Sequence, residues 1–217
     1  MLDKYRLLGP SFDTISKLYS GDAVHACRLA MLRPDTLGPG SRVLFAGAGQ
    51  GRDALHAAEL GARVSVVDIS PTMLGKFKQH LNEHPARATL AIEAIQSDAL
   101  KVEDEGFYDM VVANFYLNIF ERDKMLSQLK HLIKLLKPGG KLVIGDFAPP
   151  SGSLLNKSIQ NLYWYTAATA CFAAAGNAIH EIYNYAEILE KQGLQVKETK
   201  TFSVLGREMF CSTLAIK

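Results

Sequence analysis

The sequence predicts an α/β fold in which helices cover both faces of a mostly parallel sheet. Short apolar segments of β-type residues alternate with longer segments of helical periodicity through residues 42–147. The first apolar segment runs into a glycine-rich turn, Gly47-Ala48-Gly49-Gln50-Gly51, and then into a segment rich in Ala and Leu. The tail carries two strand-like runs around Gly206-Arg207, the signal of an antiparallel hairpin. Strands that are separated by helices require right-handed crossovers and therefore a parallel sheet.

The pattern assigns each element in turn. Residues 12–33 predict two short helices that break near Gly21 and stop at Pro34. Strands are expected at 42–46, 63–67, 88–95, 109–113 and 140–147, and helices at 51–61, 71–82 and 121–136. The last helix has acidic residues in its first turn and lysines near its end, as the helix dipole favours, and Pro138-Gly139-Gly140 is expected to stop it.

Composition predicts a single domain over residues 1–217 and excludes several partners. The net charge is +2 and the 24 Lys and Arg residues are dispersed, so no nucleic-acid partner is expected. Cys27, Cys171 and Cys211 are far apart and odd in number, which favours reduced thiols and a cytoplasmic location. Neither a secretory leader nor an integral membrane segment is predicted, and the six His residues show no metal spacing.

The glycine-rich turn lies between a buried strand and a helix N-terminus, where backbone can approach a ligand closely. The next strand delivers Asp68 at its C-terminal end, and a carboxylate there can accept both hydroxyls of a ribose. The two features together predict a nucleoside site. A dinucleotide fingerprint requires glycine at position 52, where Arg52 stands, so this spacing argues against NAD.

The spacing G-x-G-x-G, followed by Asp68, resembles motifs I and II of the class I S-adenosylmethionine (SAM) dependent methyltransferases. Three further segments follow in the family's order: SDAL at 97–100, YDMVVANFYLNIF at 108–120 and LKPGGKLVIGDF at 136–147. The resemblance covers about half of the chain. It implies a Rossmann-like seven-stranded sheet with an antiparallel last strand, and SAM as the cofactor.

The resemblance also implies a role for individual residues. The backbone of the loop would hold the methionine moiety, Asp68 the ribose, and the residues after the second and third strands the adenine. The implied cofactor-binding set is Tyr19, Ala46, Gly47, Ala48, Gly49, Gly51, Asp68, Ile69, Met73, Asp98, Ala99, Asn114 and Phe115. Two alternatives stay open: Asp98 can cap a helix, and Tyr116 can be a packing residue.

One departure concerns the position two residues before the first glycine. The family usually has an acidic residue there, where this chain has Phe45. Asp53 at the helix start could replace part of the lost charge. The departure leaves open an enzyme that uses SAM for a transfer other than methyl, as in rhodoquinone-forming relatives.

The segments outside the core are expected to define the substrate. The opening LGPSFDTISKLYSGD resembles the ubiquinone/menaquinone C-methyltransferase family at Phe12, Asp13, Tyr19 and Gly21. Residues 149–192 carry the only Trp of the chain, Trp164, among several tyrosines, which suggests a lid over a flat or lipophilic substrate. The alternative is a helix pair whose aromatic residues are core. The domain then divides into a helical cap (1–40), a SAM-binding core (41–148), this lid and a C-terminal hairpin (193–217).

Methyl transfer from a sulfonium needs chiefly positioning and exclusion of water, with a base only where the nucleophile loses a proton. His180, Asp146 and Tyr116 are the candidate catalytic residues; a lone His is more often a surface or capping residue. The sequence thus predicts a methyltransferase for a small, aromatic or quinone-like molecule. A non-catalytic SAM-binding module is the rival from another class, and a homodimer is compatible with the sequence.

Overall fold

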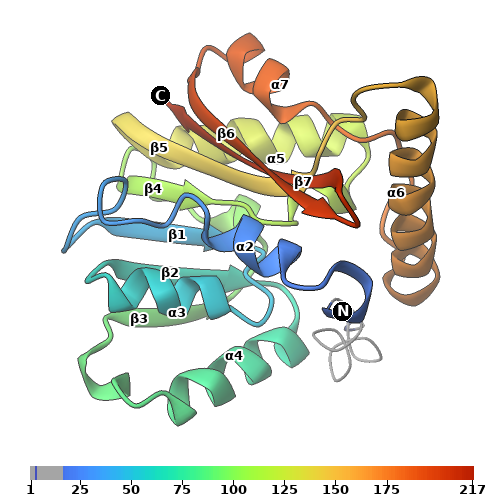
Figure 1. The fold of residues 1–217 in the computed structure, drawn as a ribbon. Helices are drawn as coiled ribbons and strands as arrows, with labels where there is room; N and C mark the ends of the chain where they lie inside the picture. Colours follow the sequence, from blue (N-terminus) through green and yellow to red (C-terminus); the bar gives the residue numbers. More distant parts are fainter. Residues whose placement is uncertain (1–2, 4–16) are drawn as a thin grey trace.

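A computed structural model describes Asp3 and residues 17–217 and confirms the predicted fold class (Figure 1). The sheet has seven strands in the order β3-β2-β1-β4-β5-β7-β6. The first five are parallel, and β7 is antiparallel to both β5 and β6. The strands are β1 (Arg42–Ala46), β2 (Arg63–Asp68), β3 (Ile92–Gln96), β4 (Tyr108–Val112), β5 (Leu136–Phe147), β6 (Gln195–Val204) and β7 (Arg207–Ile216).

Helices cover both faces of the sheet and bury two apolar cores. On one face, α5 contributes Met125, Leu129 and Leu132, which pack beside Leu189 of α7. On the other, α3 and α4 cover β1 and β2, and Phe77 of α4 is fully buried there. The helices are α2 (Ala23–Leu29), α3 (Arg52–Glu59), α4 (Pro71–Glu83), α5 (Arg122–Leu135), α6 (Leu154–Ala175) and α7 (Tyr185–Lys191), with single turns η2 (Arg87–Thr89), η3 (Ala99–Lys101) and η4 (Leu117–Ile119).

The predicted stop of the N-terminal helical region at Pro34 is wrong. Within the described part, residues 17–20 are helical and α2 ends at Leu29, well before the proline. The turn that follows is held by Thr36, whose hydroxyl donates to Met31 O and accepts from Arg33 N. A side chain that satisfies backbone groups in this way offers the chain an alternative to helix.

Two strand boundaries also differ from the expected ones. Residues 88 and 89, expected as the start of a strand, lie in the turn η2, so β3 begins only at Ile92. The Pro138-Gly139-Gly140 segment does not separate helix from strand, because α5 ends at Leu135 and β5 begins at the next residue. Instead the pairing of β4 with β5 is irregular where this segment lies, between the pairs Tyr108–Leu136 and Met110–Lys141. Proline lacks an N–H and is tolerated within sheets at such irregularities.

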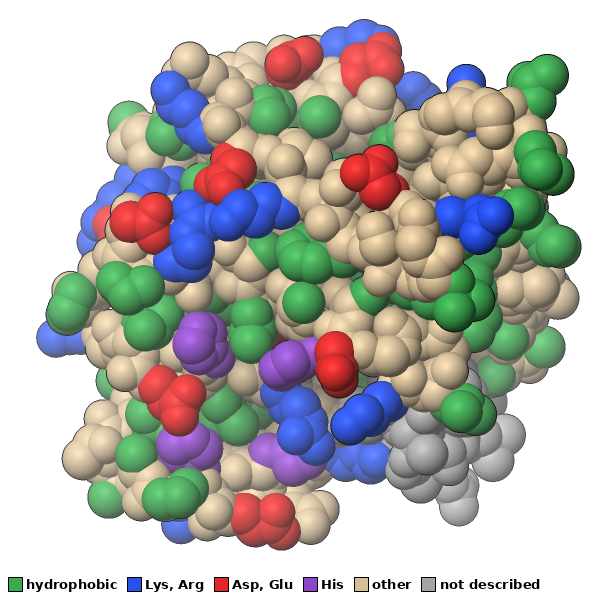
Figure 2. Space-filling model, viewed as in Figure 1, with side chains coloured by type: hydrophobic (Ala, Val, Ile, Leu, Met, Phe, Trp, Pro, Cys, Tyr) green, Lys and Arg blue, Asp and Glu red, His purple; other side chains and the backbone are tan. Residues whose placement is uncertain are grey.

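The predicted lid contains one long helix, α6, which stands at the end of the sheet beside the β6–β7 hairpin (Figure 1). Its inner face is fixed by Gln160, which donates to Glu208 O at 2.6 Å and accepts from Ser151 N at 2.8 Å. Its outer face leaves Leu154, Leu162 and Phe172 exposed, and Figure 2 shows hydrophobic side chains along this edge. Among the described residues, no helix has the length and apolar character needed to cross a membrane.

Replacing Gln160 with methionine tests how α6 is held. The substitution keeps the length of the side chain but leaves Glu208 O and Ser151 N without their partner, so the free energy of unfolding should fall by about 1–3 kcal/mol. Urea unfolding of the full chain measures this. The neighbouring exposed Asn161→Ala is the control and should change stability by less than about 0.5 kcal/mol. Equal effects of the two variants would contradict this account of the helix.

Candidate functional site

The predicted site residues lie in a row along the edge of the sheet where the parallel strands end. Backbone hydrogen bonds fix their order: Ser97 N donates to Asp68 O, Gly47 N to Val67 O, and Phe115 N to Gly145 O. Along the strands from β3 to β5 the row therefore runs from Asp98 through Asp68, the loop of residues 47–51 and Asn114 to Asp146. Ligands of open α/β sheets bind at this edge.

The first and third glycines of the loop are required by packing. All three loop glycines have positive φ, and a Cβ on Gly47 would lie 2.1 Å from the Tyr116 ring. A Cβ on Gly51 would lie 2.4 Å from the Phe77 ring. The space that these glycines leave is filled by aromatic rings of the protein itself. A side chain at either position would displace a ring from the core.

Gly49 is different, because among the described residues no atom beyond its two chain neighbours lies within 4 Å of the position that its Cβ would take. Its N–H donates to Asp68 Oδ2 at 2.8 Å, and Ser70 N donates to Oδ1 at 2.8 Å. Burial raises the pKa of Asp68, while these two N–H groups oppose the rise. A carboxylate oxygen has more than one lone pair, so both Asp68 oxygens retain acceptor capacity. The loop therefore combines an open backbone position with a fixed carboxylate.

The residues expected around adenine differ in exposure. Ile69, directly after β2, is 45% exposed, whereas Met73 and Ala99 are buried. Asp98 caps η3, since its Oδ1 accepts from Leu100 N at 3.0 Å. Of these apolar side chains, only Ile69 is exposed to solvent.

The position of Phe45 in the apolar core explains why this chain has no acidic residue there. Phe45 is buried under α3 and α4, where a carboxylate would be costly. Asp53, in the first turn of α3, is also buried and accepts from Asn114 Nδ2 at 2.9 Å. Asn114 further donates to Arg28 O and accepts from Gly145 N. The polar groups of the Asn114 side chain are therefore all used within the protein.

The two tyrosines of the predicted site make their polar contacts elsewhere. The Tyr19 hydroxyl donates to Tyr163 O on α6, and its ring stacks on Tyr163 at 4.2 Å. The Tyr116 hydroxyl donates to Gln128 Oε1 on α5, so it faces the core, in agreement with the packing alternative. Phe115, at φ 53°, turns the chain sharply after β4. Phe12 and Asp13 lie outside the described residues.

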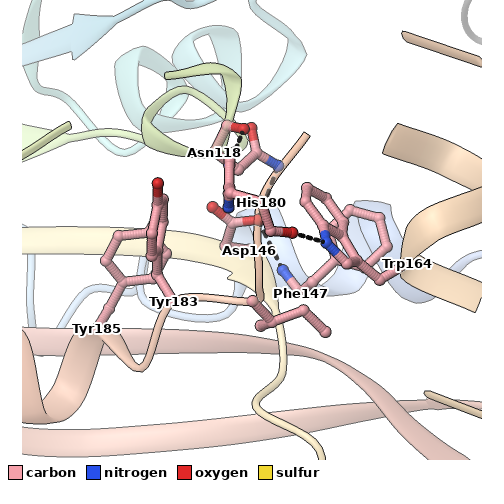
Figure 3. Close-up of a pocket in the computed structure, with 8 residues that line it drawn as sticks. Asn118, Asp146, Phe147, Trp164, His180, Tyr183 and Tyr185 are labelled. Atoms are coloured by element: carbon pink, nitrogen blue, oxygen red, sulfur yellow. Dashed lines mark hydrogen bonds between the residues drawn. The ribbon is translucent and has the colours of Figure 1, made fainter. Parts of the chain in front are cut away.

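A small, narrow pocket lies at the carboxyl end of β5, beneath α6 (Figure 3). Asp146 Oδ1 accepts from Asn118 Nδ2 at 2.8 Å and from Phe147 N at 2.7 Å. Burial raises the pKa of Asp146 to about 7 despite these hydrogen bonds. The empty space at the pocket is about 160 Å³, including space that is open to solvent, and it is too narrow for a water molecule. The lining residues are Asn118, Asp146, Phe147, Trp164, His180, Ile182, Tyr183 and Tyr185.

His180 closes this pocket and is held by backbone oxygens. Its Nε2 lies 2.8 Å from Asn118 O and its Nδ1 lies 2.6 Å from Glu181 O. The ring stacks on Tyr183 at 4.1 Å, and Trp164 Nε1 donates to His180 O at 2.7 Å. Both ring nitrogens therefore face carbonyl groups of the protein and neither is open to a substrate. A catalytic role for His180 stays a prediction that this arrangement does not favour.

Asn118 and Tyr185 also line this pocket, and neither was predicted as a site residue from the sequence. Asn118 follows β4 by a single turn and orients the Asp146 carboxyl group. Tyr185 begins α7, and its buried hydroxyl interacts with the Asp146 carboxylate without forming a hydrogen bond of ordinary geometry. The many aromatic residues of the segment drew attention to Tyr185, but its position beside Asp146 of β5 is evident only from the fold.

Residues 43–140 match the family model described as a methyltransferase domain. A ubiquinone/menaquinone biosynthesis C-methyltransferase of Geobacter sulfurreducens is 26% identical over 165 residues, which are 75% of this chain and 63% of that protein. A carboxy-S-adenosyl-L-methionine synthase of an Enterobacter species is 28% identical over 138 residues, 62% of this chain and 51% of that protein. The chain thus spans less than two thirds of the length of these curated relatives.

The fold has solved counterparts. The magnesium protoporphyrin IX methyltransferase of Synechocystis PCC 6803, crystallised with bound S-adenosylhomocysteine, superposes with a TM-score of 0.70 at 22% identity, and the match covers 99% of this chain and 97% of that one. The strand order, the glycine loop that precedes α3 and the acid that ends β2 agree with this fold and with the matched domain. Over residues 43–140 the chain is similar to the methyltransferase domain family, and its fold is that of the class I SAM-dependent methyltransferases.

Proposed function

We propose that the chain binds SAM at the edge formed by β1, β2 and β4 and methylates a small, aromatic or quinone-like molecule. The observation that carries the proposal is the open backbone at Gly49, whose N–H meets the Asp68 carboxylate at the end of β2. A cradle with free space beside a fixed acceptor suits a nucleoside with a ribose diol. The family match supports SAM as that nucleoside.

Each part of the edge suits one part of the cofactor. Asp68 would accept from the ribose, Ile69 would cover the adenine, and the backbone of residues 46–51 would hold the methionine moiety at the N-terminus of α3. When bound, SAM supplies an electrophilic methyl group. What the protein adds is orientation of the acceptor and exclusion of water.

The acceptor is proposed to bind between Phe115 and the end of β5. The Phe115 ring lies edge-on to the Phe147 ring, with 6.2 Å between the ring centroids, and the Phe147 and Trp164 centroids are 4.7 Å apart. A row of aromatic rings therefore continues from the end of β4 to α6. Asp146 is the acidic residue at the end of that row. Aromatic walls with few polar groups suit a flat substrate.

A second candidate is transfer of a group other than methyl. Similarity to a carboxy-S-adenosyl-L-methionine synthase and Phe45 in place of the acid of the first motif both favour it. SAM labelled in its methyl group distinguishes the two. Label recovered in the acceptor supports methyl transfer, and label retained in the nucleoside supports the second candidate.

We also propose a cytoplasmic location. Cys27, Cys171 and Cys211 are free thiols, although Cys27 Sγ lies only 3.2 Å from Cys211 O. Neighbouring buried thiols that remain unpaired suit a reducing compartment.

Nucleoside specificity is tested by thermal unfolding of the full chain. S-adenosylhomocysteine at a hundredfold excess over its Kd should stabilise the native state by roughly 2.7 kcal/mol and raise Tm by several degrees. NAD should leave Tm unchanged. A larger shift with NAD, or none with the sulfur nucleoside, would refute the proposed cofactor.

Asp68→Asn should weaken nucleoside binding by tenfold or more. The amide cannot accept two charge-assisted hydrogen bonds from the ribose, each worth about 1.5–3 kcal/mol. Calorimetric titration with S-adenosylhomocysteine measures the loss. Asp109→Asn is the matched control, because Asp109 pairs with Lys137 near the start of β4, at the opposite edge of the sheet. An unchanged Kd for the Asp68 variant would mean that the ribose binds elsewhere.

The raised pKa of Asp146 predicts how stability depends on pH. A carboxyl group with a folded pKa of about 7 stabilises the fold while it is protonated, and that contribution is lost as the pH rises toward 7. Relative to Asp146→Asn, which stays neutral, the wild-type chain should lose about 1.4 kcal/mol per pH unit between about pH 5 and 7. Urea unfolding of both proteins across this range gives the difference. If the difference in unfolding free energy between the two proteins does not change with pH, the raised pKa of Asp146 is contradicted.

A further inference from the structure

Two buried polar atoms in the pocket at the end of β5 have no hydrogen-bond partner. Asp146 and Tyr185 are 2% and 3% exposed, and their side chains interact with one another, but neither Asp146 Oδ2 nor the Tyr185 hydroxyl makes a hydrogen bond of ordinary geometry. The remaining acceptor, Asp146 Oδ1, is fully engaged with Asn118 and Phe147 N. The unpaired atoms therefore belong to the interior of the pocket (Figure 3).

Water cannot satisfy these atoms, because the pocket is too narrow to hold it. A buried polar atom without a partner costs about 1–3 kcal/mol, and native proteins retain few of them without a functional reason. One ligand group can satisfy both. A hydroxyl donates one hydrogen bond, as Asp146 Oδ2 requires once the carboxyl group is ionised, and it can accept another from the Tyr185 hydroxyl.

The surroundings specify what carries that hydroxyl. Aromatic rings form a continuous wall. The distances between neighbouring ring centroids are 4.7 Å from Phe147 to Trp164, 5.3 Å from Trp164 to His180 and 4.1 Å from His180 to Tyr183. No Lys or Arg is among the residues that line the pocket, so a carboxylate or phosphate would meet Asp146 without a strong counter-charge. The wall favours a flat, uncharged ring.

We propose that Asp146 and Tyr185 form a recognition site for a ring hydroxyl, so that the acceptor is a phenol or an enol. The inference rests on the proposed function and names the substrate class of the same site. Asp146 Oδ2 accepts the hydrogen bond of the hydroxyl, and Tyr185 donates to its oxygen. Entry of the ring requires the side chains to part, and the Trp164–His180 hydrogen bond is the contact between α6 and the following segment that closes the pocket.

The test compares phenol with anisole, its methyl ether, which cannot donate. Both are titrated into the full chain with and without S-adenosylhomocysteine, and binding is followed by calorimetry and by the fluorescence of Trp164, the only tryptophan. The wild-type chain should bind phenol at least tenfold more tightly than anisole. Asp146→Asn and Tyr185→Phe should each bring the two affinities within about twofold of one another, while the affinity for anisole stays the same.

Tyr108→Phe is the matched control, because Tyr108 is an equally buried tyrosine whose hydroxyl contacts Asp104 at the other edge of the sheet. It should keep the preference for phenol. If Asp146→Asn does not fold, Tyr185→Phe alone decides. Equal binding of phenol and anisole by the wild type, or binding of neither, overturns this inference even where S-adenosylhomocysteine binds; failure of that nucleoside to bind instead refutes the proposed function.

Discussion

The buried amide of Asn114 is the interaction on which the geometry of the site depends. It donates to Arg28 O and to Asp53 Oδ2 and accepts from Gly145 N, and so joins α2, α3 and β5 at the end of β4. The fit is close, since a Cβ on Gly145 would lie 2.6 Å from Asn114 Oδ1. Because Asp53 lies in the first turn of α3, this contact fixes the helix, and hence the preceding loop, relative to β5. No other side chain of similar size supplies both the donors and the acceptor.

Two halves of the site follow from this arrangement. On the β2 side the groups are backbone amides, the buried carboxylate of Asp68 and Ile69, which is exposed to solvent. On the β5 side the groups are rings packed around one carboxyl group, with no room for water. The first half suits a polar ligand that arrives from solution. The second suits an apolar one that must be desolvated before it meets Asp146.

The sequence predicted the first half well because its determinants are local. The loop, the strand that precedes it and Asp68 lie within about 25 residues, and each feature has a conformational requirement that few residues meet. The second half depends on contacts between distant segments. His180 is held by Asn118 O, 62 residues earlier, and Asp146 meets Tyr185 only because α7 packs against the sheet. No local pattern encodes such contacts. The errors at Pro34 and Pro138 have a similar origin, since a hydroxyl of Thr36 and an irregular strand pairing, rather than proline, set those boundaries.

The contact between Gly51 and Phe77 has an evolutionary consequence. The glycine is required by a ring of α4 rather than by a ligand, so the two positions form one unit under selection. A relative that carries a smaller residue at the position of Phe77 is free to carry alanine at the position of Gly51, at the cost of the positive φ alone. Substitutions at the two positions should therefore arise together across a lineage. Position 49 has no ring beside it, so substitutions there should vary independently of both, limited by the positive φ and by the ligand rather than by packing.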